Sequence, residues 1–130
     1  MSFAGIMRDA LVAALAAEPD LRLNRIGDGP GEAAPVPHAL LDEIACVPWG
    51  GKALPGWEAR TTLTIMDRGG AERIAELCAA AERALAAMPR GIGEWETSGV
   101  AVTRSRLERR RDGMRIARME LRLRAAKTGD

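Results

Sequence analysis

The side chains that could do covalent or metal chemistry are few in this chain. His38 is the only histidine, so a histidine-containing triad would have to use it, and a metal site of several histidines is excluded. Arg8 and Asp9 interrupt the stretch where a signal peptide needs an apolar run, so we expect no export. Cys46 and Cys78 are therefore expected to be buried thiols, not a disulfide or half of a metal site.

Sequence motifs of catalysis are also missing. The chain has no GxxxxGK[ST], no GxGxxG after a strand, no HExxH and no GxSxG, and its glycine-rich stretches lack a Lys-Ser/Thr pair for phosphate. Asp42 and Glu43 are neighbours in a predicted strand and would point to opposite faces, which makes a poor acid–base pair. Glu94 and Glu96 could share a face, but such exposed carboxylates are usually solvated. We therefore expect no enzyme, cofactor or metal.

Arginines concentrate toward the C-terminus. From residue 101 onward ten Lys or Arg stand against four acids, a net charge of +6, whereas residues 1–100 carry −5. Such a cluster could contact phosphates or an acidic protein surface, or it could only keep a hairpin tip in solution. Aromatic residues make up 3% of the chain, too few for base-stacking platforms, and no recognition helix or zinc finger accompanies the arginines. Sequence-specific DNA reading is not expected.

These arginines fall in a predicted β-hairpin. Residues 94–110 and 114–125 have strand character, and Asp112-Gly113 between them is a strong signal for a two-residue turn. With Arg111 opposite Met114, the hairpin should extend beyond the apolar core and present a basic tip.

The same turn fixes a register. Val100 and Val102 then face Ala125 and Leu123, and Arg104 and Arg106 follow on the same face, opposite Leu121 and Met119. One face of the hairpin is thus apolar near its open end.

Two helices and a second strand pair precede the hairpin. Apolar spacing predicts a helix over 3–17 with Ser2 as its N-cap, and another between Gly69-Gly70 and Pro89. Residues 38–47 and 57–67 read as an antiparallel strand pair.

The connections are rich in glycine and proline. Residues 21–26 could form a short edge strand before a loop that reaches Pro37, and residues 48–56 should form a projecting, flexible loop. Trp49 and Trp57 flank the second loop, either as interface anchors or as residues that close a strand end onto the core.

Together these elements predict an α+β fold. We expect a four-stranded, mainly antiparallel sheet with two helices packed on one face, in a single domain over residues 1–130. No stretch approaches the about 18 to 20 apolar residues of a membrane span, so no membrane partner is expected. A face or an edge of so small a sheet is available to a neighbouring subunit.

The order of elements and several short sequence segments resemble the tail-terminator (tail-completion) family of long-tailed bacteriophages and gene transfer agents. The resemblance covers nearly the whole chain. It is carried by the helix Arg8–Leu15, the strand Pro37–Val47 after a Gly/Pro loop, the segment Thr62–Glu72 that leads into an Ala-rich helix, and the closing hairpin with Arg111-Asp112-Gly113 and Arg118–Ala125.

The resemblance implies a structural protein with no catalytic position. Such a subunit forms a homohexameric ring that caps the tail tube protein and meets the head–tail connector or stopper protein, while DNA passes through the lumen only as cargo. It would assemble in the bacterial cytoplasm and end at the head–tail junction of a phage or gene transfer agent particle. The alternatives are another connector component, such as the stopper, and a non-specific DNA-binding module that uses the arginine-rich hairpin.

A lumen lined by arginines would grip the phosphates of passing DNA. We therefore hypothesise that Arg109, Arg110 and Arg111 face a protein interface or the outer rim and not the bore. The candidate residues for a subunit or partner interface are Trp49, Lys52, Trp57, Arg104, Arg106, Arg109, Arg110, Arg111 and Arg115.

Overall fold

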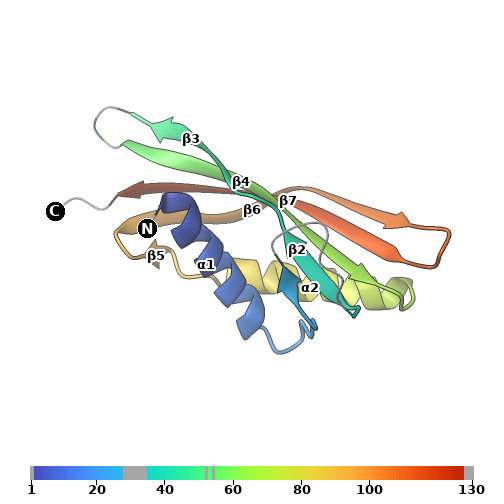
Figure 1. Ribbon diagram of the computed structural model, residues 1–130. Helices are drawn as coiled ribbons and strands as arrows, with labels where there is room; N and C mark the ends of the chain where they lie inside the picture. Colours follow the sequence, from blue (N-terminus) through green and yellow to red (C-terminus); the bar gives the residue numbers. More distant parts are fainter. Residues whose placement is uncertain (1, 28–34, 52, 54, 128–130) are drawn as a thin grey trace.

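The computed structural model describes residues 2–27, 35–51, 53 and 55–127. Within these residues, two helices cover one face of a curved sheet, and the opposite face carries no helix (Figure 1). This confirms the expected α+β class, and neither of the two helices has the length and apolar character needed to cross a membrane. In chain order the elements are α1 (Phe3–Ala17), β1 (Ile26–Gly27), β2 (His38–Leu41), β3 (Ala45–Gly50), β4 (Pro55–Asp67), α2 (Ala71–Ala86), β5 (Gly91–Ile92), β6 (Trp95–Arg109) and β7 (Arg115–Lys127).

Helix α1 forms where a capping side chain precedes apolar residues at helical spacing. The hydroxyl of Ser2 accepts a hydrogen bond from the Gly5 N–H at 3.1 Å, as the sequence predicts. Met7, Leu11 and Leu15 recur every four residues and are buried in the core. Both predicted helices are therefore present, with α1 over the predicted residues.

Helix α2 is amphipathic. Ile74, Leu77, Ala81 and Leu85 are buried in the same core as the residues of α1, while the glutamates between them stay exposed. The helix ends at Ala86, before the proline that cannot continue it.

The sheet has more strands than the four predicted. Among the described residues it has seven strands in the order β1-β2-β4-β7-β6-β5, with β3 also paired to β4. It is mixed, because β1 runs parallel to β2 while every other pair is antiparallel. The short edge strand expected over 21–26 is only the two-residue β1, and the Gly/Pro loop after it lies largely outside the described residues.

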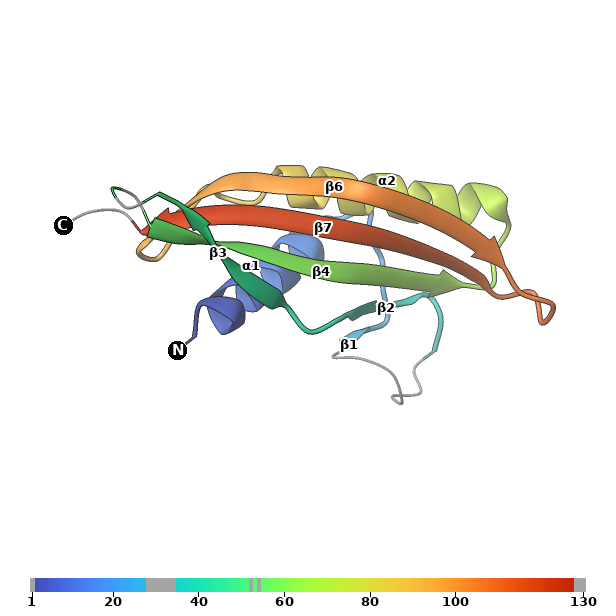
Figure 2. The same ribbon diagram turned by 90° about the horizontal axis from the view of Figure 1, so that it is seen from above.

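The predicted strand over 38–47 is broken. Thr62 O accepts the Asp42 N–H at 3.0 Å, and the Thr61 hydroxyl donates to Asp42 O at 2.8 Å, where the chain leaves the ladder. On either side of the break, β2 and β3 pair with different parts of β4, one after the other along the same edge (Figure 2). The predicted antiparallel pairing is thus confirmed, but the prediction of one continuous strand over 38–47 is wrong.

The loop predicted over 48–56 is also shorter than expected. Strand β3 continues to Gly50, and β4 begins at Pro55, opposite it. Residues at both ends of the predicted loop are therefore strand residues, which brings Trp49 into the sheet.

Strand β7 is the centre of the sheet and has two chemically distinct faces. Met119, Leu121 and Leu123 are buried under the helices. Arg118, Glu120, Arg122 and Arg124 alternate with them on the face without helices, which we call the open face.

The hairpin turn is one residue longer than predicted. Arg109 pairs with Arg115, the Arg110 N–H donates to Met114 O at 2.8 Å, and Gly113 takes a positive φ of 87°. A left-handed residue at this place is the mark of a three-residue hairpin loop and is readily adopted by glycine. The predicted register is therefore wrong by one residue beside the turn, and by two residues at Val100 and Val102, which pair with Leu123 and Leu121.

A bulge at Thr103 then changes the face on which the arginines lie. Val102 pairs with Leu121 over the core, but the next pair is Arg104 with Glu120 on the open face. Arg104 and Arg106 consequently lie on the open face, and their predicted places opposite Leu121 and Met119 are wrong.

Replacing Leu63, which is fully buried on β4, tests the position of the core. The variant Leu63→Ala should lower the free energy of unfolding by about 2–5 kcal/mol, because it leaves a cavity between the sheet and the helices. Glu76→Ala on the exposed side of α2 should change it by less than about 0.5 kcal/mol. Urea unfolding measures both values. An equal, small effect for the two variants would contradict the burial of Leu63.

Candidate functional site

The candidate interface residues fall into two groups at opposite ends of the sheet. Trp49 and Trp57 lie on the β3–β4 hairpin at one end, and the candidate arginines lie on the β6–β7 hairpin, whose turn is at the other end (Figure 1). We call these the aromatic end and the arginine end. Lys52 lies outside the described residues.

The aromatic end gathers all four aromatic residues of the chain. Phe3 of α1 stacks on Trp57 with the ring centroids 6.4 Å apart, and it meets Trp95 edge to face at 4.7 Å. Trp57 thus helps to close the core but remains 37% exposed. Phe3 and Trp95 were not predicted here, because their sequence positions give no sign that the strand register brings them to Trp57.

On the open face, the fourth aromatic residue belongs to a charged cluster. The guanidinium carbon of Arg124 lies 5.2 Å from the ring centroid of Trp49. Its Nε donates to Glu58 Oε1 at 2.9 Å, and Arg60 donates to the other carboxylate oxygen of Glu58 at 2.8 Å. The hydrogen bond from Arg124 is the largest cause that lowers the pKa of Glu58, with Arg60 adding to it against the opposing effect of burial.

At the arginine end, some of the side chains are neutralised within the chain. Arg104 pairs with Glu120 at 3.7 Å and Arg118 with Glu108 at 2.9 Å. These pairs are exposed and each is worth little stability.

The turn is held from two sides. Arg110 pairs with Asp112 at 3.5 Å, and Arg68 donates to the Asp112 carbonyl at 2.8 Å. The Asp112 carboxylate also accepts the Met114 N–H at 3.0 Å, the largest cause that lowers its pKa. Within the described residues, no ion pair involves Arg106, Arg109, Arg111 or Arg115.

The arginine end extends beyond the core but not beyond the sheet. Leu107 is 60% exposed and borders a recess of about 140 Å³ with Ile74 of α2. Strand β4 nevertheless pairs with β7 as far as Asp67 opposite Arg115, so only the turn projects. The predicted basic tip is thus present, on a shorter projection than expected.

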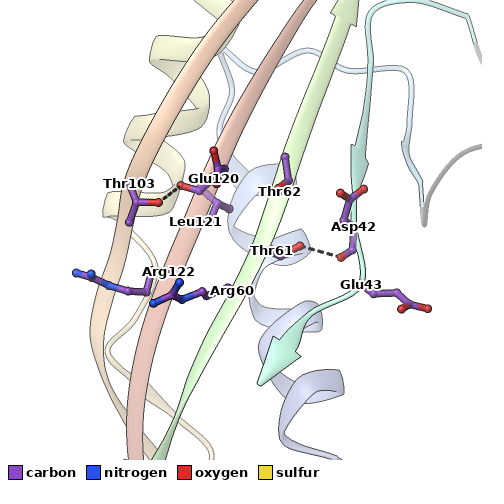
Figure 3. Close-up of a pocket in the computed structure, with 9 residues that line it drawn as sticks. All are labelled: Asp42, Glu43, Arg60, Thr61, Thr62, Thr103, Glu120, Leu121 and Arg122. Carbon is purple, nitrogen blue, oxygen red and sulfur yellow. Dashed lines mark hydrogen bonds between the residues drawn. The ribbon is translucent and has the colours of Figure 1, made fainter. Parts of the chain in front are cut away.

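The open face also has a depression of about 450 Å³, shown in Figure 3. At its centre Arg60 and Arg122 are directly opposite each other on β4 and β7. Asp42 and Glu43 line it from the segment between β2 and β3, and Glu43 points away from the arginines. Guanidinium groups so placed can bind a carboxylate or a phosphate.

The residues with reactive side chains lie elsewhere. His38 is buried, and its Nδ1 has no hydrogen-bond partner among the described residues. Cys46 and Cys78 are free and half-buried, less buried than expected, and burial raises the pKa of both thiols. No group of three His, Cys, Asp or Glu side chains in the described ranges could hold a metal ion.

The lowered pKa of Glu58 gives stability that is present above its unfolded pKa, near 4.5, and is lost as the pH falls through its folded pKa. The variant Glu58→Gln should therefore be less stable than the parent at about pH 7, and the difference should shrink as the pH falls below about 4.5. Urea unfolding at both pH values measures this. A difference independent of pH, or one as large for the exposed Glu76→Gln, would show that the two arginines do not stabilise the charged carboxylate.

The sequence and the fold were compared with those of known proteins. The family model of the tail completion protein gp17 matches residues 9–127. The fold is similar to that of a chain in the virion of a native gene transfer agent particle, with a TM-score of 0.79, 17% sequence identity, and coverage of 96% of this chain and 99% of that chain. No curated protein matches the sequence significantly. The chain belongs to the tail completion protein gp17 family and is thus a structural tail protein.

Proposed function

We propose that this chain is a tail terminator, the subunit of a hexameric ring that caps the tail tube and joins it to the head–tail connector. Membership of the tail completion family supports a place in the tail. The similar fold of a chain in a gene transfer agent virion supports the view that this fold serves in such particles. Residues 1–130 act as one terminator domain in this proposal, and DNA passes through the lumen of the ring.

One observation carries the proposal. A surface with exposed tryptophans lies at one end of the sheet, and a surface rich in arginine lies at the other end (Figure 1). Tryptophan and arginine are residues that dominate binding energy at protein interfaces. Strands β4 and β7 pair continuously from Gly56 to Asp67, so the sheet holds the two ends at a fixed spacing. A rigid part with a contact surface at each end suits a protein that joins two different neighbours.

The two ends suit different partners. The aromatic end offers partly exposed rings beside an arginine, and the arginine end offers several cations on a turn. We assign one end to the tube protein and the other to the connector or stopper protein. Arg109, Arg110 and Arg111 then contact protein or the outer rim, since an arginine-lined bore would retain DNA.

Non-specific DNA binding is the second candidate function. It is favoured by Arg106, Arg109, Arg111 and Arg115, for which the described residues supply no ion pair. Acidic residues interleave with them, however, and Glu108, Asp112 and Glu120 each pair with an arginine of the same hairpin. Interleaved acids repel a polyanion but tolerate a protein surface that carries both charges.

Deleting the gene in a particle-producing host tests the role at the tail. We expect tails of irregular length that do not join heads, because nothing ends tube growth or meets the connector. Electron microscopy of lysates measures both. The variant with Arg109, Arg110 and Arg111 changed to Ala should give fewer particles in which a tail is joined to a head, whereas Glu72→Ala should restore normal particles.

Normal particles without the gene would contradict the proposed role. The same purified triple variant separates the two candidate functions. If the parent chain retards duplex DNA at physiological salt, and the variant does not, the DNA-binding module is favoured instead.

A further inference from the structure

The two lateral edges of the open face carry opposite charges. One edge is formed by the segment between β2 and β3, where Asp42 and Glu43 are both exposed. The other edge is β6, with Arg104 and Arg106 on the open face. We call these the acidic edge and the basic edge.

A third arginine reaches the basic edge. Arg122 belongs to β7, but its neighbour on β6 is Ala101, whose small side chain leaves room above the strand. Figure 3 shows the Arg122 side chain extending over β6, away from Asp42 and Glu43. Three guanidinium groups are therefore available at one edge and two carboxylates at the other.

These charges are not satisfied by one another within the chain. Among the described residues, no ion pair involves Asp42, Glu43, Arg106 or Arg122, and Arg104 has only an exposed pair with Glu120. Arg122 is also directly opposite Arg60, and Arg106 is directly opposite Arg118. Like charges that face each other across strands are destabilising, so a carboxylate from outside would relieve them.

The backbone at the two edges leaves room for a neighbour. Beyond Glu96, no strand of the described chain pairs with the outer side of β6, because β5 covers only Trp95 and Glu96. At the acidic edge, the backbone of Asp42 is bound to Thr61 and Thr62, while its exposed side chain makes no ion pair within the described residues. The contact between such edges would be made by side chains.

We propose that a second copy of this chain docks side by side, with Asp42 and Glu43 of one copy paired to Arg104, Arg106 and Arg122 of the next. Two different, complementary patches on opposite sides of one molecule produce head-to-tail contacts, and such contacts close into a ring when the rotation permits. The inference rests on the proposed ring and names the surfaces that join its subunits. The aromatic end and the turn of the arginine end, with Arg109, Arg110 and Arg111, then remain free for the other partners.

Charge exchange between the edges tests this pairing. The acidic-edge variant is Asp42→Arg with Glu43→Arg, and the basic-edge variant is Arg104→Glu with Arg106→Glu. Each variant places like charges at every subunit contact, which should lower the subunit affinity by roughly a hundredfold or more. When both variants are present, copies can alternate with opposite charges at every contact, and an even-numbered ring is restored.

The readout is the yield of complete particles in the gene-deleted host. We expect each variant alone to give few or no particles and the two together to restore a yield near that of the parent chain. Glu72→Arg with Glu76→Arg on the exposed side of α2 is the matched control, and it should support normal yield. Thermal melts of the purified variants verify folding.

Three results would overturn the pairing: full yield from either variant alone, no rescue by the mixture of two folded variants, or a defect confined to the basic-edge variant together with lost DNA binding. The last result would assign the arginines to phosphates. The first two results leave the proposed terminator role intact, because that role is contradicted by normal tails after deletion of the gene.

Discussion

The structure depends on the alternation of side chains along β7. This central strand pairs with β4 on one side and β6 on the other, so its two faces organise the whole sheet. Met119, Leu121 and Leu123 hold the helices on one face. The residues between them are therefore required to leave the core, and they place a row of charges on the open face.

Two local irregularities decide how the arginines of β6 join that row. The three-residue loop with Gly113 in a left-handed conformation shifts the register by one residue, and the bulge at Thr103 turns Arg104 and Arg106 to the open face. If the pairing of Val102 with Leu121 continued without the bulge, Arg104 and Arg106 would lie opposite Met119 and Ala117, over the apolar core. The basic edge thus exists because one extra residue is accommodated in the middle of β6.

Much of this fold could be predicted from periodicity and capping. Ser2, the apolar stripes of both helices and the alternation over 57–67 are local signals, and each gave an element that the structure contains. The break after β2 could not be predicted, because it depends on Thr61 and Thr62 of another strand.

The candidate site was less accessible to sequence reasoning for a similar reason. The arginine-rich hairpin is a visible cluster, but the gathering of Phe3, Trp57 and Trp95 and the pairing of Glu58 with Arg124 arise only from long-range strand register. The opposite charges of the two edges also lie far apart in the sequence. In the sequence, the only sign of these charges was the difference between an acidic first part and a basic last part of the chain.

The molecule therefore has ends that suit different proteins and edges that suit copies of itself. The mass of the purified chain in solution, measured by light scattering behind size exclusion over a range of concentrations, tests this most directly. We expect the mass to rise and then stop near six times the 13.9 kDa of one chain, as head-to-tail contacts close a ring. A mass that stays at one or two chains at every concentration would contradict the proposed ring.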